Sequence, residues 1–539
     1  MAQDTPSFFT LDRGSVSTSA SLIAPVDGRY RLLASATAPR GVEAEAILED
    51  LAWRVARTDA ALSGSLEGWQ TWSRLEVRTT PAPRACLVAA SAETGELLER
   101  AFSGAGWHVA FRSFEPRPDI VALGQASLNP DVDAIVVGGR EVTDDIEREH
   151  IRLLWPLAGS LARFRDDLAV IACGPFRERP EGIGDDRLFS LPAPDPVPAT
   201  APSELRQAAS QVGFHLRTQG EAGGAEGRGS LRTTIASLAV LLGNRVEGVE
   251  IGAAAGSRTL AHPDAEVRHA VLSTAALLPG SIIDDDAVSE SILRWSTGGG
   301  DAAGNADRLR ELCLRPWSGI DRTSAHLRLA ALRAALERMQ QAWDAAHHDG
   351  RAEEDAADVL VLSGGGFDSV PSAAAALAVV DSIRRPGAAT ILHDHARVLA
   401  PLGALPVEGD RRRLLADLVD DVLLPIGSVL LTGALGERGT GRGTMSISTS
   451  LGSDELDLEP GDLRLVDLPP GIVARLDIDP LDGSIMGVTG RRIALEVSGG
   501  LGGLLVDTRD IPLRLPDSPD RRRALLEGWE EPAWIASER

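Results

Sequence analysis

The chain has 539 residues, more than a single hydrophobic core normally organises, so we expect several domains. Hydrophobic residues make up 43% of it and charged residues 24%, and no apolar stretch approaches the roughly 18–20 residues of a membrane span. The formal net charge of −24 argues against nucleic acid as a partner, because an acidic surface repels phosphates. The chain contains no lysine, which excludes a Walker-type phosphate loop.

The first residues, MAQDTPSFFTLD, contain no basic segment followed by a long apolar one. We therefore expect no secretory signal, a cytoplasmic protein and no membrane partner. Three cysteines, Cys86, Cys173 and Cys313, lie far apart in the chain without Cys-x-x-Cys spacing. This pattern argues against a disulfide framework or a zinc cluster, and we expect reduced, buried thiols.

The N-terminal segment predicts three short strands at residues 8–12, 19–24 and 30–36. The first turn reads LDRGS (11–15), and the second contains the Asp-Gly pair that is typical of a tight hairpin. A helix is expected at about 43–62. This segment raises the question of whether its first hairpin binds a phosphate or only resembles a phosphate-binding hairpin in shape.

Residues 84–196 alternate apolar runs with helical stretches, which predicts βαβ units and a small, doubly wound parallel sheet. Its first turn, SAETGE (91–96), lacks the Gly-x-Gly-x-x-Gly of a dinucleotide site, and the chain has no Asp-x-His-x-x-Gly that could supply a cobalamin ligand. We interpret this block as a scaffold or a docking surface. A Pro-rich segment (192–203) and a Gly-rich one (218–230) follow it and mark a boundary.

Beyond this boundary, VEGVEIGAAAGSRTLA (246–261) predicts a second hairpin, and residues 322–346 predict a helix. DVLVLSGGGFDSVPSAAAALAVVDSI (358–383) reads as a buried strand, a triple-glycine turn and a helix. Residues 427–516 alternate short β-rich runs with Gly, Pro and Asp turns, which indicates a terminal β-domain.

Three glycine turns thus follow strands: LDRGS (11–15), EIGAAAG (250–256) and LSGGGFD (362–368). Glycine allows a backbone to approach a ligand closely and to present its amides, and a carboxylate at a strand end can hold a hydrated magnesium ion. Each turn alone predicts no more than a change of chain direction. Their order along the chain is more informative than any one of them.

The order of hairpin, second hairpin and strand-GGG-helix resembles the actin-like, sugar-kinase and Hsp70 ATPases. Within that superfamily the chain most resembles the MutL-type accessory protein of adenosylcobalamin-dependent glutamate mutase. The resemblance runs nearly end to end, and its most specific parts are PDVDAIVVGGREVTDD (130–145), VLVLSGGGFDSVPSAAAAL, ILHDHARVLAPLGAL (391–405) and GGLGGLLVDTRDIPLRLPDSPDRRRALLEGW (499–529).

This resemblance implies an α/β protein with a two-lobed, ribonuclease H-like fold. The first lobe would begin within 1–83, the doubly wound insert would span 84–203, the second lobe 204–426 and a C-terminal β-rich domain 427–539. It also implies ATP or ADP with Mg²⁺ as cofactors, bound by Asp12 and by the backbone at these positions: Gly14, Ser15, Thr18, Gly252, Gly364, Gly365 and Gly366. The implied partner is a protein, by resemblance a cobalamin-dependent mutase.

The departures from the family pattern fall in the phosphate loops. In the first hairpin, Val16 replaces a threonine and Ser19 replaces the family's lysine. In the second, Glu250, Gly252 and Ala254 remain near-equivalent, but the distal carboxylate and both hydroxyls are absent. Phosphoryl transfer needs such charged groups, so the sequence predicts weak or lost hydrolysis, a pseudo-ATPase.

If hydrolysis persists, Asp12 would be the magnesium carboxylate and Glu250 would orient the water, with Arg13 or Arg258 as candidate cations. Two other functions stay open. One is a structural or interaction protein that keeps the fold without binding nucleotide. The other is a small-molecule kinase, for which Asp144 and Asp145 are the nearby candidate bases. His393 and His395 have a spacing that suits a metal, and the alternative for them is a polar turn before a helix.

Overall fold

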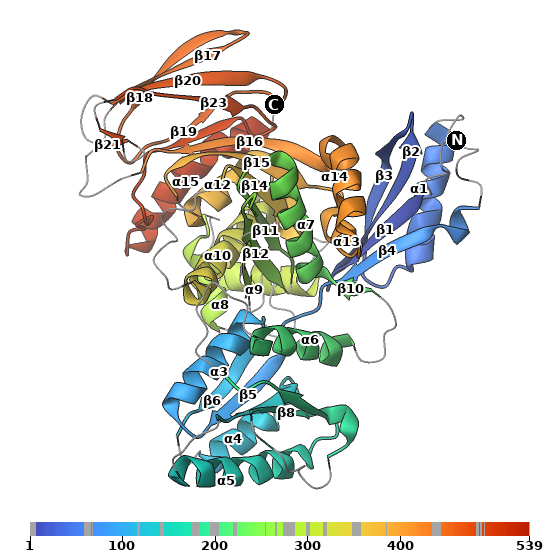
Figure 1. The fold of residues 1–539 in the computed structure, drawn as a ribbon. Helices are drawn as coiled ribbons and strands as arrows, with labels where there is room; N and C mark the ends of the chain where they lie inside the picture. The colour runs from blue at the N-terminus through green and yellow to red at the C-terminus, as the bar shows by residue number, and fades with distance from the viewer. Residues whose placement is uncertain are drawn as a thin grey trace.

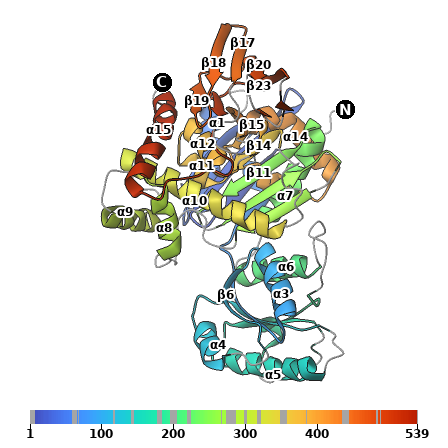
Figure 2. The ribbon, with the colours of Figure 1, turned by 90° about the vertical axis from the view of Figure 1, so that its left-hand side faces the viewer.

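The computed structural model shows two lobes side by side, an insert below them and a small sheet above (Figure 1). It describes residues 7–537, with gaps at 59–65, 67, 116–118, 141–144, 175, 177–182, 195–203, 219–223, 254, 265–266, 273–285, 298–301, 316–320, 348–356, 384, 434–442, 481–483, 486–487 and 490. A view turned by 90° shows the insert as a separate body, with α4 and α5 at the end farthest from the lobes (Figure 2).

The first lobe is a mixed sheet with the strand order β3-β2-β1-β4-β10. Its first three strands are antiparallel, and β4 and β10 extend the sheet in parallel. Asp27 and Gly28, at φ 50° and 80°, form the predicted Asp-Gly turn. Helix α1 buries Leu48 against Phe9 of the sheet. The elements are β1 (Phe8–Arg13), β2 (Ser17–Val26), β3 (Arg29–Pro39), α1 (Ala44–Thr58), the 3₁₀ turn η2 (Trp69–Thr71), β4 (Ser73–Arg78) and β10 (Ala225–Glu226).

The second lobe repeats this order in β13-β12-β11-β14-β15, with the same pattern of antiparallel and parallel pairs. Two such sheets in tandem are the arrangement of the actin-like ATPases, so the predicted fold class is confirmed. Helices α7, α13 and α14 cover one face of the sheet, and α10 and α12 cover the other. The predicted helix 322–346 coincides with α10.

The elements of the second lobe are α7 (Gly227–Leu242), β11 (Val246–Ile251), β12 (Gly256–Ala261), β13 (Val267–Leu272), α8 (Asp286–Arg294), α9 (Ala302–Leu314), α10 (Arg322–Ala346), β14 (Val359–Ser363), α11 (Gly365–Asp368), α12 (Ser372–Ser382), β15 (Gly387–Asp394), α13 (Leu399–Gly403), α14 (Glu408–Val422), β16 (Leu423–Leu431), β19 (Leu463–Val466), β24 (Leu504–Asp507) and α15 (Pro519–Ser537).

The insert is the doubly wound sheet that the sequence predicts. All its strand pairs are parallel, in the order β6-β5-β7-β8-β9, and helices pack on both faces. Its elements are β5 (Arg84–Ala89), α3 (Ala92–Gly104), β6 (His108–Ser113), α4 (Ile120–Ser127), β7 (Ala134–Gly138), α5 (Asp145–Ala162), β8 (Ala169–Cys173), the 3₁₀ turn η3 (Asp185–Arg187), β9 (Leu188–Leu191) and α6 (Glu204–Thr218).

The segment predicted as a C-terminal β-rich domain, 427–539, divides between two bodies. Strands β16, β24 and β19 extend the second-lobe sheet beyond β15, and α15 packs against α12. A separate antiparallel sheet, β18-β17-β20-β23, stands above them. Its strands are β17 (Gly443–Thr449), β18 (Gly452–Leu458), β20 (Val473–Pro480) and β23 (Ile493–Ser498), with the small hairpin β21 (Ser484–Ile485) and β22 (Val488–Thr489).

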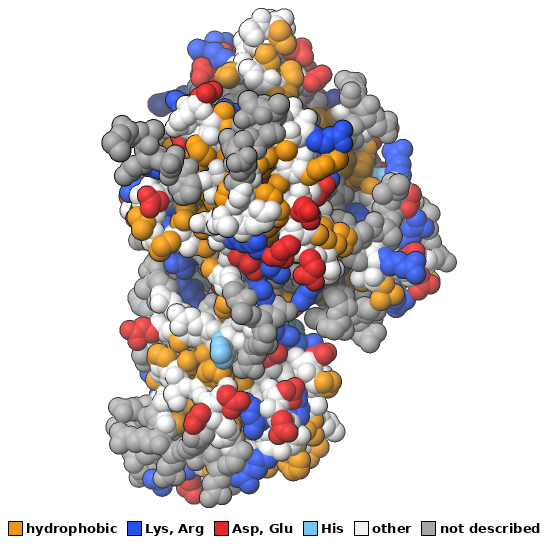
Figure 3. All heavy atoms as spheres, turned by 90° about the vertical axis from the view of Figure 1, so that its right-hand side faces the viewer, with side chains coloured by type: hydrophobic (Ala, Val, Ile, Leu, Met, Phe, Trp, Pro, Cys, Tyr) orange, Lys and Arg blue, Asp and Glu red, His pale blue; other side chains and the backbone are white. Residues whose placement is uncertain are grey.

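Acidic and basic side chains are interspersed on the face shown in Figure 3. The described residues on this face form no basic stripe of the kind that binds a nucleic acid backbone. Among the described helices, none is long and apolar enough to cross a membrane.

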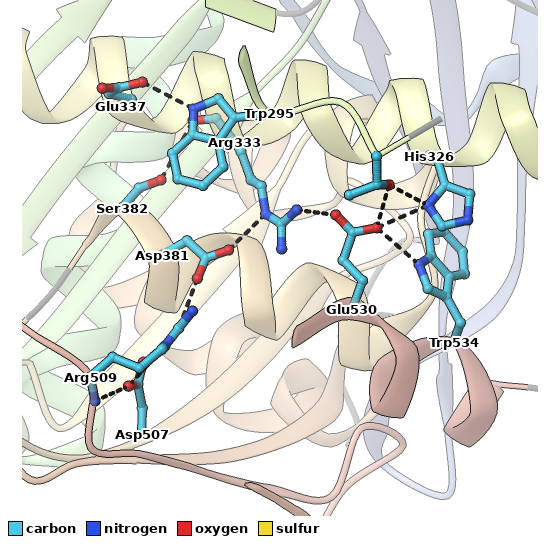
Figure 4. Close-up of polar contacts among 11 residues, drawn as sticks. Trp295, His326, Arg333, Glu337, Asp381, Ser382, Asp507, Arg509, Glu530 and Trp534 are labelled. Carbon is cyan, nitrogen blue, oxygen red and sulfur yellow. Dashed lines mark hydrogen bonds and ion pairs between the residues drawn. The ribbon is translucent and has the colours of Figure 1, made fainter. Parts of the chain in front are cut away.

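A network of buried charges fixes the C-terminal tail to the second lobe (Figure 4). Asp381 of α12 bridges two arginines, with distances of 2.7 Å to Arg333 Nε and 2.8 Å to Arg509 Nη2. Arg509 also pairs with Asp507 at 2.7 Å, and Arg333 also pairs with Glu530 of α15. We call these five residues the buried ion network; each of their side chains is at most 2% exposed.

Three further side chains contact Glu530. Its Oε2 lies 2.9 Å from His326 Nδ1 and accepts hydrogen bonds of 2.9 Å from Thr297 and 3.4 Å from Trp534 Nε1. Burial opposes ionisation of Glu530, but the Arg333 charge and the contacts with His326 and Thr297 outweigh it and hold the pKa of Glu530 below its usual range. The charges of the network are therefore compensated inside the protein, and the Val-Asp-x-Arg run of the tail has a structural role.

Asp381→Ala is expected to lower the free energy of unfolding of the second lobe by about 3–5 kcal/mol, because it leaves two buried arginines without their shared partner. Urea unfolding followed by tryptophan fluorescence measures the change. Asp477→Ala, which removes the partner of exposed Arg475 on β20, is the control and should leave the urea midpoint nearly unchanged. Equal midpoints for the two variants would contradict the assigned role of the network.

Candidate functional site

The hairpins that open the two lobes have the same construction. Asp12 and Glu250 are the next-to-last residues of β1 and β11, and Gly14 and Gly252 begin the turns that follow. In each turn the glycine N–H donates a hydrogen bond of 2.8 Å to the carbonyl three residues further along the chain. The two predicted carboxylates therefore occupy equivalent positions in the two lobes.

Asp12 and Glu250 also influence each other electrostatically. Burial raises the pKa of Glu250 to about 7, and the charge of Asp12 adds to the rise. Burial raises the pKa of Asp12 to about 6, although the charge of Arg397 opposes this shift. Ser257, which faces Glu250 in the hairpin, donates to its Oε2 at 3.0 Å. The site thus brings half-buried carboxylates from the two lobes close enough for the charge of Asp12 to act on Glu250.

The triple-glycine turn packs against the second hairpin. Gly364 has φ 93°, and a Cβ there would lie 2.6 Å from the carbonyl oxygen of Ile251, the last residue of β11. A Cβ on Gly365 would lie 2.9 Å from Nη2 of Arg397. Gly366 is buried in α11. Gly364 needs glycine because of its positive φ and the closeness of the β11 backbone, whereas a side chain at Gly365 would displace the Arg397 guanidinium.

The turn that follows β15 contacts the first lobe here. The carboxylate of Asp394 accepts hydrogen bonds from the backbone N–H groups of Val398 at 2.9 Å and Leu399 at 3.2 Å. The carbonyl of Ala396 accepts a hydrogen bond of 3.1 Å from Ser21 of the first lobe. Burial raises the pKa of Asp394 to about 6. This turn, residues 394–399, is called the lobe-contact turn below.

Arg397, in the lobe-contact turn, supplies a cation to the site. It is a buried, non-glycine residue at φ 52°. Its Nη1 donates to Ser17 of the first hairpin at 3.0 Å, and its Nη2 pairs with Asp368 at 2.5 Å. Neither Arg397 nor Ser17 was among the predicted site residues. The run ILHDHARVLAPLGAL contains Arg397, but nothing in the run shows that this arginine reaches the first lobe, because that depends on the turn after β15 and on the packing of the two lobes.

The two arginines suggested by the sequence are engaged elsewhere. Arg13 forms an ion pair of 2.8 Å with Glu76 on the neighbouring strand. Arg258 is fully buried, pairs with Glu247, and lies 4.4 Å above the ring of Trp343. Their contacts indicate structural roles.

Ser15 and Thr18 lie in or beside the first hairpin turn. The carbonyl of Ser15 accepts a hydrogen bond of 3.5 Å from Arg40, and Thr18 is buried opposite Arg13 in the strand register. Neighbouring residues of a strand point to opposite faces, so Ser17, which contacts Arg397, and Thr18 do not face the same way. Ala254 of the second turn lies outside the described residues.

The two candidate metal histidines are placed as follows. His393, near the end of β15, lies with its Nε2 3.1 Å from Asp368 Oδ1. Burial lowers the pKa of His395, and the neighbouring charge of His393 adds to this. Within the part of the chain that the structure describes, no group of three or more His, Cys, Asp or Glu residues is arranged to hold a metal ion.

No protein-family model matches the sequence, and comparison with curated proteins finds no match either. Solved structures do match. The nucleotide-free structure of acetone carboxylase, described as performing ATP-dependent acetone carboxylation, aligns with a TM-score of 0.30 at 11% identity, covering 84% of this chain and 80% of its own. Component A of (R)-2-hydroxyglutaryl-CoA dehydratase from Acidaminococcus fermentans aligns with a TM-score of 0.27 at 11% identity, covering 76% and 99%.

A third match is the PilM-PilN type IV pilus biogenesis complex, with a TM-score of 0.25 at 14% identity, covering 76% of this chain and 94% of the other. All three TM-scores are below 0.5, so the assignment of the fold rests on the repeated strand order of the two lobes. The resemblance to the glutamate mutase accessory protein stays a prediction.

In metal-free buffer, Glu250→Gln is expected to flatten the pH dependence of thermal unfolding between pH 4.5 and 8. The pKa of Glu250 rises from its ordinary 4.5 to about 7 in the folded protein, so the folded state retains a proton that the unfolded state has lost. Wild-type stability therefore falls as the pH rises through this window. At pH 8 the variant should be more stable, by on the order of 2 kcal/mol.

Glu247, on the same strand, provides the matched control. Burial opposes its ionisation, but the charges of Arg258 and Arg385 outweigh this and hold its pKa below the usual range. Glu247→Gln should therefore destabilise the protein at neutral pH, because Arg258 loses its buried partner. Similar destabilisation by both variants at pH 8 would show that Glu250 is held as a stable anion, contrary to the expectation.

Proposed function

We propose that this protein binds a magnesium nucleotide, ATP or ADP, between its two lobes and hydrolyses it slowly or not at all. The observation that carries the proposal is the equivalence of the two hairpins. Each places a carboxylate, Asp12 or Glu250, beside a glycine turn, Gly14 or Gly252, and the charges of the two carboxylates are coupled across the lobes.

The residues at the site fit a magnesium ion held through water. Asp12 and Glu250 supply oxygen ligands, the donors that Mg²⁺ prefers, and their burial favours a neutralising cation between them. Asp12 is the residue that would hold the hydrated ion. When bound, the ion would neutralise phosphate charge.

Backbone groups would make the other proposed contacts, those with the phosphates and the nucleoside. The amides at Gly14, Ser15 and Gly252 would face phosphates, and the turn Gly364–Gly366 would lie against the nucleoside; none of these contacts needs a particular side chain. Glu250 would orient a water molecule, but its raised pKa makes it a weak base near pH 7 in the metal-free protein. This supports slow hydrolysis at most.

The small-molecule kinase has less support. Of its two candidate bases, Asp144 lies outside the described residues, and Asp145 begins α5 in the insert, the body below the two lobes. The other alternative to nucleotide binding is a structural or interaction protein that has this fold and binds no nucleotide.

Calorimetric titration with ATP and with ADP, with and without Mg²⁺, tests the binding site. We expect micromolar affinity that Asp12→Asn weakens at least about tenfold and that Gly365→Val weakens similarly, because a side chain there would collide with Arg397. Arg74→Ala is the control: Arg74 is on β4 and pairs with Glu45, and its removal should leave binding unchanged. No heat at millimolar nucleotide, from folded protein, would favour the structural protein instead.

The same proposal includes a partner enzyme, which by resemblance is a cobalamin-dependent mutase, served by this protein in an accessory or chaperone-like role. We expect the mutase to co-elute in size-exclusion chromatography, to a different extent with ATP than with no nucleotide. Asp12→Asn should remove the nucleotide effect while keeping the fold. Separate elution in every nucleotide state would rule out a stable complex with that enzyme.

A further inference from the structure

We propose that Arg397 is the phosphate-binding cation of the interlobe site, and that Asp368 is the counter-ion it exchanges for a phosphate. The inference rests on the proposed nucleotide site and names the group that takes the role of the missing lysine. The chain has no lysine, and Ser19 stands at the position where the family places one. A cation for this site must therefore come from an arginine elsewhere in the chain.

Among the described residues, Arg397 is the arginine with a contact to the first hairpin turn from the opposite lobe. Its Nη1 donates to Ser17 at 3.0 Å. Asp12, the carboxylate proposed to hold the magnesium ion, is the next-to-last residue of the strand that leads into this turn. The guanidinium thus reaches, from the second lobe, the hairpin in which a serine replaces the lysine.

The backbone around Arg397 is built to hold it in place. Asp394 fixes the lobe-contact turn through the N–H groups of Val398 and Leu399. Arg397 itself adopts φ 52°, a conformation that a residue with a Cβ occupies only when its surroundings determine it. On the far side of the guanidinium, Gly365 leaves the space that a side chain would take, since its Cβ would lie 2.9 Å from Nη2.

The guanidinium has capacity for another acceptor. It carries five N–H donors, and two contacts engage it: Ser17 at Nη1 and Asp368 at Nη2. Nε is buried and has no hydrogen-bond partner among the described residues. Arg397 is 8% exposed, so this donor is shielded from bulk water. A phosphate can satisfy Nε and Nη2 together, in the two-pronged geometry that arginine offers to oxyanions.

Asp368 is suited to be displaced. Its side chain is 34% exposed, whereas that of Arg397 is 9% exposed. It also has a second partner, His393, whose Nε2 lies 3.1 Å from Oδ1. When a phosphate takes Nη2, Asp368 can keep its contact with His393 and turn toward solvent. Asp368 therefore competes with a phosphate for Arg397. Removing the charge of Arg397 should weaken phosphate binding, and removing the charge of Asp368 should strengthen it.

The test uses the full chain and titrates ADP, pyrophosphate, inorganic tripolyphosphate and adenosine by calorimetry. Arg397→Gln is expected to weaken ADP and tripolyphosphate about 10- to 100-fold and to leave adenosine unchanged. Arg397→Lys should restore part of the loss, because it keeps the charge and loses the two-pronged contact. Asp368→Asn should tighten ADP and tripolyphosphate about 3- to 10-fold, and the Asp368→Asn/Arg397→Gln double variant should lose that gain.

Arg411→Gln controls for the cost of removing a buried arginine. Arg411 is 7% exposed and donates to Ser237 at 2.9 Å and to the carbonyl of Leu405 at 2.8 Å, so its loss should lower stability and leave ADP affinity unchanged. Circular dichroism and thermal unfolding establish that each variant is folded at the temperature of the titration.

The outcomes separate this inference from the proposed function. If wild-type protein binds ADP and Arg397→Gln binds it equally well, the nucleotide site stands and the role of Arg397 is wrong. If wild-type protein binds tripolyphosphate through Arg397 but shows no difference between ADP and pyrophosphate, the anion site stands and the nucleotide proposal is wrong. If wild-type protein binds neither ADP nor tripolyphosphate, both are wrong.

Discussion

One buried carboxylate, Asp394, determines the geometry at the junction of the lobes. A buried carboxylate is costly unless hydrogen-bond donors surround it, and Asp394 obtains them from Val398, Leu399 and Ser363. Satisfying this one group folds the chain back on itself directly after β15. The turn so formed brings Ala396 and Arg397 to the first lobe, so the interlobe contacts follow from a local requirement within the second lobe.

The contacts of the second lobe differ in kind on its two faces. Behind α10 and α12, charges are fully buried and the tail is locked in place. Toward the first lobe, a buried apolar cluster joins the two bodies, with Phe8 and Ile23 of the first lobe among its members and Leu399 of the second. Polar contacts lie at the edge of this cluster, where Arg31 pairs with Asp421 at 2.7 Å and has a side chain 53% exposed. The tail is thus held to the second lobe by buried charges, and the first lobe is held mainly by apolar burial.

Much of the fold could be predicted from local patterns. The Asp27-Gly28 turn, the glycine turns after β1, β11 and β14, and helix α10 each depend on residues close together in the sequence, and the structure contains them all. The parallel insert was predictable because strand and helix patterns alternate within it. By contrast, β16, β24 and β19 read as short strands whose partners the sequence does not specify, and they complete the second-lobe sheet.

The site was predictable only in part, for a similar reason. Asp12 and Glu250 could be identified because each precedes a glycine turn in its own hairpin. Arg397 could not, because its relation to Ser17 depends on the turn fixed by Asp394 and on the packing of two lobes. Arg258 was misleading because strand alternation does not say which face of β12 meets Glu247. Contacts between segments far apart in the chain, more than composition, determine which charged side chains lie at the site.

The late position of β24 and α15 in the chain has a consequence for synthesis on the ribosome. The sheet of the first lobe ends with β10 at residue 226, so its strands are all available before the second lobe begins. The second-lobe sheet awaits β24 at 504–507, and its buried charges await Glu530. At translation rates of about 5–20 residues per second, the nascent second lobe has the edge of β16 open for about 4–15 s and Arg333 unpaired by the tail for about 10–40 s. During that interval its exposed strand edge and unpaired arginine are the parts of the chain most in need of a chaperone.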